Sequence, residues 1–209
     1  EEPKTDLIVL DDCFQHRKIN LKLNIVLTTY HSPFYNDFII PVGNLREQRN
    51  SYKRADVIIV TKCPELISND DLDHFRKKIQ LHNNQNIFFT KINYDNNLKG
   101  DSKINLDLIL DPIILVTGIA NSDPIVDFLK NSRVVFEHIS YSDHFNYSQN
   151  DIDKIEKNSN KLIITTEKDF QKIQLLKRKN KWVYLEIKIE FLENESIFNS
   201  LIDKAINTS

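Results

Sequence analysis

The sequence predicts an α/β protein in which most strands pair in parallel, and two observations predict this fold class. Short apolar runs rich in branched side chains recur along the 209 residues, as in strands that are buried on both faces of a sheet. Segments with helix-capping signals alternate with these runs, as in chains whose helices cover a parallel sheet.

Each apolar run is interpreted as one strand. The first is the most informative, because four apolar residues are followed at once by polar ones. A short apolar piece at 38–40 predicts an edge strand, and the other runs predict buried ones. In chain order, the predicted strands are 7–10, 23–28, 38–40, 57–60, 87–92, 113–116, 134–139, 162–165 and 182–187.

Each helix is predicted from its first turn. Ser, Asn or Asp before an apolar-periodic segment favours an N-cap, and an acidic residue three positions later completes a capping box. Proline fits the first helical position, and acidic residues early with basic residues late suit the helix dipole. The predicted helices are 45–54 capped by Asn44 with Glu47, 69–81 capped by Ser68, 124–130 after Asp123 with Pro124 first, 149–157 after Ser148, 167–176 and 195–205.

The composition limits the class of protein. A chain of this length holds one or two domains, and the polar stretch 94–107 places a boundary between residues 98 and 111. The net charge of −2 argues against a dedicated nucleic-acid binder, and two cysteines suit a reducing compartment. No apolar run approaches the roughly 20 residues of a membrane span. Because the chain starts at Glu1 and lacks Met, we expect it to be the C-terminal portion of a larger enzyme.

Two adjacent carboxylates follow the first predicted strand. Asp11 and Asp12 come directly after 7–10, with Gln15 and His16 within one turn. Ligands of open α/β sheets bind where strands end, and neighbouring carboxylates repel unless a cation or a donor compensates. We therefore favour a phosphoryl-transfer site, in which one Asp binds Mg²⁺, over a simple polar turn. Three glycines cannot form the usual phosphate-binding loop.

Other polar segments are ambiguous when taken alone. Arg46 and Glu47 stand at a predicted helix start, a natural place for an anion, although a solvated Arg and a capping Glu explain them as well. Asp143 next to His144 can fix the imidazole tautomer or form a surface pair without a role. The segment 165–169 fits an N-cap with acidic residues that suit the helix dipole.

Together these segments resemble the tetraacyldisaccharide 4'-kinase family, the lipid A 4'-kinases. The resemblance runs in order through most of the chain and weakens after about residue 176. The matching segments are 11–17 (D-D-x-F-Q-H-R), 41–47 (P-A-G-x-L-R-E), 53–56 (K-R-A-D), 118–121 (G-I-x-N), 143–144 (D-H) and 165–169 (T-E-K-D).

The resemblance implies ATP-dependent phosphorylation, with Mg²⁺, of the 4'-hydroxyl of a lipid-linked glucosamine disaccharide, the lipid A precursor. It implies a protein peripheral to the cytoplasmic face of the inner membrane of a Gram-negative bacterium. Residues 1–108 would be the C-terminal part of an incomplete P-loop kinase core, and 112–209 a second, smaller α/β lobe over the acceptor. The family places its P-loop, a catalytic Asp and a membrane-associating helix upstream, so we expect this chain alone to be inactive and to bind ATP poorly.

The resemblance also assigns roles to single residues. Asp11 and Asp12 would hold Mg²⁺ and support the acceptor, with Glu47 assisting the metal. The phosphate, cofactor or acceptor site would be lined by Gln15, His16 and Arg46. His144 would work with the upstream catalytic Asp and Asp143 would orient it.

Two other classes of function remain open. The chain can be a non-catalytic lipid- or partner-binding α/β module, in which Asp11 and Asp12 are vestigial. It can also be a metal-dependent hydrolase that uses these two residues with His16 and His144, although no clustered ligand spacing supports that reading. A phosphate-binding motif in the upstream coding sequence favours the kinase, and its absence favours the binding module.

Overall fold

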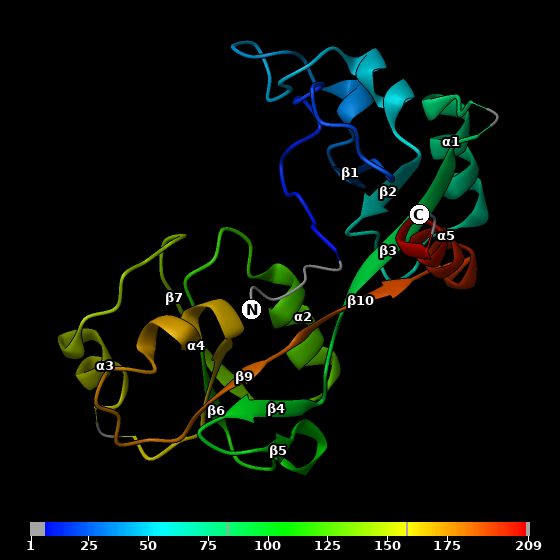
Figure 1. The fold of residues 1–209 in the computed structure, drawn as a ribbon. Coiled ribbons are helices and arrows are strands. Elements are labelled where there is room, and N and C mark those ends of the chain that lie inside the picture. Colours follow the sequence, from blue (N-terminus) through cyan, green and yellow to red (C-terminus); the bar gives the residue numbers. More distant parts are fainter. Residues whose placement is uncertain (1–6, 83, 158, 208–209) are drawn as a thin grey trace. The chain divides into compact units, whose positions relative to one another are not determined.

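The computed structural model describes residues 7–82, 84–157 and 159–207, and it confirms the α/β class with parallel sheets. The chain divides into two compact units (Figure 1). The first consists of residues 1–92 together with 189–209, and the second consists of residues 93–188.

The first unit is built on a sheet of four strands in the order β1-β2-β3-β10, counted over the described residues. β1 pairs with β2 in parallel, and β2 pairs with β3 in parallel. Two helices belong to the same unit. The bounds are β1 (Ile25–Thr29), β2 (Val57–Thr61), β3 (Asn86–Tyr94), β10 (Ile187–Phe191), α1 (Asn69–Ile79) and α5 (Glu195–Asn207).

Alternate side chains of β2 face the two helices of this unit, because successive residues of a strand point to opposite faces. Ile58 and Val60 belong to the cluster that includes Phe75 of α1. Val57 and Ile59 belong to the cluster against which Phe198 of α5 packs. The sheet is therefore covered on both faces, which explains why β2 is an uninterrupted apolar run.

The start of α1 agrees with the sequence prediction. The side chain of Ser68 accepts a hydrogen bond from the backbone N–H of Asp71, and the Asp71 carboxylate accepts from the backbone N–H of Ser68. This reciprocal capping box satisfies two N–H groups that the first helical turn leaves unpaired. Ser148 forms the same arrangement with Asp151 at the start of α3 (Gln149–Ile155) in the second unit.

The second unit contains a sheet of six described strands in the order β5-β4-β9-β8-β6-β7. β7, β6, β8 and β9 are parallel neighbours, and β4 pairs with β9 and with β5 in antiparallel fashion. The bounds are β4 (Asn97–Gly100), β5 (Ile104–Asn105), β6 (Ile113–Thr117), β7 (Phe136–Ser140), β8 (Ile163–Thr166), β9 (Trp182–Leu185), α2 (Asp123–Asn131) and α4 (Glu167–Ile173).

Helices cover both faces of the parallel part of this sheet. Leu115 of β6 packs in one cluster with Leu129 of α2. On the other face, Ile114 packs in a cluster with Ile152 of α3 and the fully buried Trp182. The Trp182 indole N–H donates to Glu156 Oε1 at 2.9 Å, so the largest buried side chain of the unit also satisfies its polar atom.

The prediction of a buried strand at residues 7–10 is wrong. These residues form no strand in the described chain, and Ile8 and Val9 are 72% and 82% exposed. An apolar run becomes a buried strand only beside another strand, and β1, at the edge of the described sheet, pairs with β2 alone. Residues 7–10 therefore lack the neighbouring strand that a buried strand of this composition needs.

The predicted edge strand at 38–40 and the predicted helix at 45–54 are also wrong. The first is a single bridge between Ile39 and Leu45. The second is a 3₁₀ helix, η2 (Arg49–Arg54), whose N-cap Gln48 makes no side-chain capping bond. The capping box expected of Asn44 does not form, since its side chain bonds the Asp37 carboxylate at 3.2 Å.

The boundary between the units differs from the predicted ranges 1–108 and 112–209. The polar stretch 94–107 contains β4 and β5, which add to the sheet of the second unit. Each of these strands has a single apolar residue in the core cluster or packed against it, Leu98 in β4 and Ile104 in β5, so hydrophobic periodicity does not reveal them. The last residues, 189–209, return to the first unit, because Phe191 and α5 pack on its sheet.

Candidate functional site

The loop at residues 11–16 is a compact turn with exposed polar side chains. Asp12 adopts a left-handed backbone conformation with φ 49°, which Asp tolerates better than most residues. The Gln15 side-chain amide donates to the Asp12 carbonyl oxygen at 2.8 Å, and the His16 N–H donates to the Cys13 carbonyl at 2.8 Å. These bonds fix the turn, and they leave Asp11, Asp12 and His16 exposed at the surface.

An ion pair joins this loop to the second predicted site segment. Arg46 Nη1 lies 2.5 Å from Asp12 Oδ2, and both side chains are about 60% exposed, at 59% and 61%. The two residues are 34 positions apart in sequence. The cation that the adjacent carboxylates Asp11 and Asp12 need is therefore supplied, in this structure, by Arg46.

Glu47 lies between two arginines. Arg54 Nη2 donates to Glu47 Oε2 at 2.6 Å, and Arg17 Nε is 3.6 Å from Oε1. The hydrogen bond from Arg54 lowers the pKa of the Glu47 carboxyl below its ordinary value. Arg54 also donates to the Phe14 carbonyl at 3.1 Å and stacks on the Phe14 ring. Glu47 thus anchors the turn and does not cap a helix.

Arg54 and Arg17 are site residues to which the sequence analysis assigned no role. Arg54 belongs to the K-R-A-D segment, and Arg17 ends the segment 11–17. Both lie within segments that carry the family resemblance, which is the signal that could have identified them. Spacing in the sequence does not predict that either arginine contacts Glu47. Arg17 is 30 positions away from Glu47, and Arg54 reaches it from the 3₁₀ helix η2.

The carboxylates of this site differ in how well they could bind Mg²⁺. Within the described part of the chain, no three His, Cys, Asp or Glu side chains gather closely enough to hold a metal ion. Magnesium often takes one or two carboxylates and keeps waters and phosphate oxygens as its other ligands. The exposed, adjacent Asp11 and Asp12 fit that requirement. Glu47 fits it poorly, because arginines engage both its oxygens.

The Glu47 contacts predict a pH-dependent stability. A carboxyl whose pKa is lowered on folding stabilises the folded state above its ordinary value of 4.5, and this contribution is lost as the pH falls through the lower folded-state pKa. We expect Glu47→Gln to lower the free energy of unfolding by about 1 kcal/mol at pH 7, since charge-assisted hydrogen bonds are lost. Urea titrations followed by circular dichroism at pH 7 and pH 3.5 check this, and an equal difference at both pH values would contradict it.

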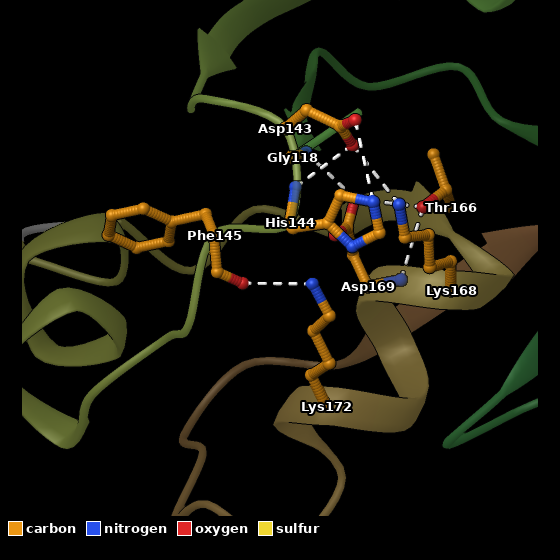
Figure 2. Close-up of polar contacts among 8 residues, drawn as sticks. All are labelled: Gly118, Asp143, His144, Phe145, Thr166, Lys168, Asp169 and Lys172. Carbon is orange, nitrogen blue, oxygen red and sulfur yellow. Dashed lines mark hydrogen bonds and ion pairs between the residues drawn. The ribbon is translucent and has the colours of Figure 1, made fainter. Parts of the chain in front are cut away.

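A second group of polar residues lies in the other unit, after the ends of β6 and β8 and beyond β7 (Figure 2). His144 is 76% exposed in its side chain and adopts φ 58°. Asp143 Oδ1 accepts from the His144 backbone N–H at 2.9 Å, and Asp143 Oδ2 is 3.6 Å from His144 Nε2. The loop thus presents the imidazole to solvent, beside its carboxylate.

Lys168 completes this surface group from the start of α4. Its ammonium lies 3.1 Å from Asp143 Oδ1, and this hydrogen bond is the main reason that the pKa of Asp143 is lowered. Lys172, one turn later, donates to the Phe145 carbonyl at 2.9 Å. Two lysines of one helix therefore hold the loop that carries His144, as Figure 2 shows.

Asp169 is the buried centre of this region, and the sequence analysis treated it only as part of a helix cap. That cap is confirmed, because the Thr166 hydroxyl accepts from the Asp169 N–H at 3.1 Å. The fully buried Asp169 carboxylate also accepts from the Thr166 hydroxyl and from the Gly118 N–H, both at 2.8 Å. A Cβ on Gly118 would lie 2.8 Å from the Tyr147 hydroxyl and 3.0 Å from Asp169 Oδ1, so a larger residue there would displace these side chains.

The predicted site residues therefore fall into two groups. The first unit brings together Asp12 with Arg46, and Glu47 with Arg17 and Arg54. The second unit brings together Asp143, His144 and Lys168. Each group lies within its own unit, and each joins segments that are distant in sequence.

Comparison with known proteins connects both groups to one family. The family model described as tetraacyldisaccharide-1-P 4'-kinase matches residues 1–207. A tetraacyldisaccharide 4'-kinase of Flavobacterium johnsoniae is 37% identical over 199 residues, covering 94% of this chain and 58% of the relative. That of Flavobacterium psychrophilum is 38% identical over 211 residues, covering 99% and 61%. The chain thus spans less than two thirds of these relatives.

A solved structure agrees in fold. The crystal structure of "apo" form LpxK from Aquifex aeolicus in complex with ATP superposes with a TM-score of 0.67 at 24% sequence identity. The match covers 94% of this chain and 56% of the other chain. At this identity the likeness supports the fold, which agrees with the P-loop-kinase-like α/β architecture expected from the sequence.

Proposed function

We infer the function of this chain from the premise that it belongs to the tetraacyldisaccharide-1-P 4'-kinase family. We propose that it contributes to the ATP-dependent phosphorylation of the 4'-hydroxyl of a tetraacylated glucosamine disaccharide 1-phosphate, a step of lipid A biosynthesis. The observation that carries the proposal is the Asp12–Arg46 ion pair, because it joins two segments of the family resemblance into one polar surface of acidic and basic groups.

The residues of the first unit have distinct parts in this proposal. Asp11 and Asp12 would hold Mg²⁺, which when bound neutralises charge on the phosphates. Arg46, already beside a carboxylate, would exchange that partner for a phosphate oxygen, which its guanidinium binds equally well. Gln15 fixes the turn that presents Asp12, and His16 would contact phosphate or acceptor oxygens. Such chemistry depends mainly on positioning.

The lipid substrate also suggests where the enzyme works. No described helix has both the length and the apolar character that crossing a bilayer demands. We propose that the enzyme binds peripherally to the cytoplasmic face of the bacterial inner membrane, where its ATP and its lipid-linked acceptor meet.

A transfer assay tests the proposal. The protein is expressed from its complete coding sequence and incubated in detergent micelles with Mg²⁺, γ-labelled ATP and the tetraacyldisaccharide 1-phosphate. We expect label in a lipid product that a 4'-phosphatase removes. Binding of the lipid without any label transfer would support the lipid-binding module instead.

His144 gives a separate prediction for the second unit. We expect His144→Asn, which suits the left-handed backbone at this position, to lower kcat by about 10²-fold with little change in the KM for ATP, since an acid–base partner is lost. The control is His138→Asn. His138 lies in β7, outside the loop that carries His144, and burial lowers the pKa of its imidazole. An unchanged kcat in His144→Asn would return His144 to a surface role.

A further inference from the structure

An apolar loop projects from the first unit between β1 and β2. Phe38, Ile39, Ile40 and Val42 are 58%, 43%, 58% and 80% exposed, and together with Pro41 they form what we call the 38–42 loop. In Figure 1 this light-blue segment extends away from the strands of its unit. Single exposed apolar residues are ordinary, but a contiguous apolar patch marks a surface that binds something.

Backbone hydrogen bonds hold the 38–42 loop in this exposed conformation. The Leu45 N–H donates to the Phe38 carbonyl at 2.9 Å, and the Ile40 N–H donates to the Leu45 carbonyl at 3.0 Å. Gly43 suits this turn, because a Cβ there would clash with the Phe38 carbonyl oxygen and with the Asp37 carboxylate. These bonds fix the backbone of the loop in the conformation that exposes its apolar side chains.

Basic residues border the apolar surface. The Arg49 guanidinium lies 4.4 Å above the centroid of the Phe38 ring, and its Nε donates to the Asp37 carbonyl at 2.6 Å. Lys53 follows on the same 3₁₀ helix and is exposed. The other two basic residues of the range 33–54, Arg46 and Arg54, are paired with Asp12 and Glu47, so the positive charge beside the loop comes from Arg49 and Lys53. A positive border is thus local to this loop.

A hollow of about 470 Å³ opens between the loop and η2, lined by Phe38, Ile39, Val42, Gln48, Arg49 and Asn50. Its apolar residues come from the loop, and its polar ones come from η2 and the residue before it. The apolar residues at the tip of the loop match the acyl chains of a lipid monolayer, and the basic residues behind the tip match the headgroup phosphates.

We propose that the 38–42 loop inserts into the acyl-chain boundary of a bilayer that contains anionic phospholipids, with Arg49 and Lys53 on the headgroup phosphates. The proposal rests on the proposed function only in that a lipid-linked acceptor lies in such a bilayer. Basic residues are attracted to an anionic lipid surface, and burial of each apolar side chain among acyl chains adds to the binding. The loop would bring the adjacent Arg46 and Glu47 to the membrane surface.

Vesicle binding tests this assignment. The protein from the complete coding sequence is sedimented with vesicles of phosphatidylglycerol and phosphatidylethanolamine. We expect Ile40→Asp with Val42→Asp to weaken vesicle binding at least 5-fold. The matched control is Leu66→Asp, since Leu66 is 94% exposed on the same unit but outside the loop; it should bind like the unmodified protein. Equal binding of the double variant and the control would overturn the proposal.

A spectroscopic readout covers the case in which another segment also anchors the protein. Val42→Trp should be quenched by brominated acyl chains when vesicles are added, whereas Leu66→Trp should not. The native Trp182 is fully buried in the second unit and gives a constant background. If Val42→Trp is not quenched although the protein sediments with the vesicles, the proposal is overturned. It is also overturned if the protein forms a dimer that Ile40→Asp with Val42→Asp abolishes without any loss of vesicle binding.

The two proposals fail in different ways. Absence of phosphate transfer by the unmodified protein in micelles would remove the proposed function and leave the vesicle result standing. Normal transfer in micelles with an unquenched Val42→Trp on vesicles would remove only the membrane role of the 38–42 loop.

Discussion

Asp12→Ala is expected to lower kcat by about 10³-fold in the micelle assay. In the metal-binding role proposed for Asp12, loss of the carboxylate removes several kcal/mol of charge stabilisation from the transition state. It also leaves Arg46 without the partner that it contacts at 2.5 Å. Loss of the ion pair itself should cost little stability, because the pair is more than half exposed and exposed ion pairs contribute about 0–1 kcal/mol. Kinetics and urea titration of the same preparation measure both effects.

The backbone at Asp12 requires a matched control. Its φ of 49° disfavours alanine by roughly 1–2 kcal/mol, so Asp12→Ala combines backbone strain with loss of the carboxylate. Asp12→Asn tolerates the same backbone and removes only the charge. We expect it to lose most of the activity and almost none of the stability. If Asp12→Asn unfolds readily while turnover persists, Asp12 has a structural role.

Asp169→Ala is expected to destabilise the second unit by about 3 kcal/mol. The substitution removes an acceptor that takes hydrogen bonds from the Gly118 N–H and the Thr166 hydroxyl. It leaves a buried backbone donor unsatisfied, which costs about 1–3 kcal/mol for each such group. The loss extends to the ends of β6 and β8, since Asp169 joins the residues that follow or end these strands.

Trp182 makes this effect measurable in one unit. It is the only tryptophan of the chain and is fully buried in the second unit, so its fluorescence reports the unfolding of that unit. Glu167→Ala is the control, because Glu167 is exposed in the first turn of the same helix. A change of less than about 0.5 kcal/mol in Asp169→Ala, equal to that of the control, would show that the buried network is dispensable.

The elements that sequence reasoning predicted well are those whose signals are local. β2 and β6 are uninterrupted apolar runs, and α1 and α3 begin at capping boxes formed by Ser68 and Ser148. Both signals depend on residues within a few positions of each other. They therefore survive without any knowledge of the tertiary fold.

The predictions that were wrong depend on contacts between residues that are distant in sequence. Residues 7–10 have a strand composition, but a strand also needs a neighbour, which no window of sequence specifies. Glu47 fits a capping box by spacing, but Arg54 and Arg17 bind it instead. In the same way, the pair of Asp12 with Arg46 connects residues 34 positions apart. The chemical types of the first-unit site residues were predictable, whereas their partners were not.

The division of the chain implies an order of assembly during synthesis. The second unit is one uninterrupted stretch, 93–188, whereas the first needs residues on both sides of it. A ribosome that adds residues from the N-terminus completes the second unit before it delivers β10 and α5 to the first. Until then, Val57, Ile59 and Phe88 lack the cover that Phe191, Phe198 and Leu201 provide. The nascent chain therefore carries one sheet with a bare apolar face while a later unit already folds.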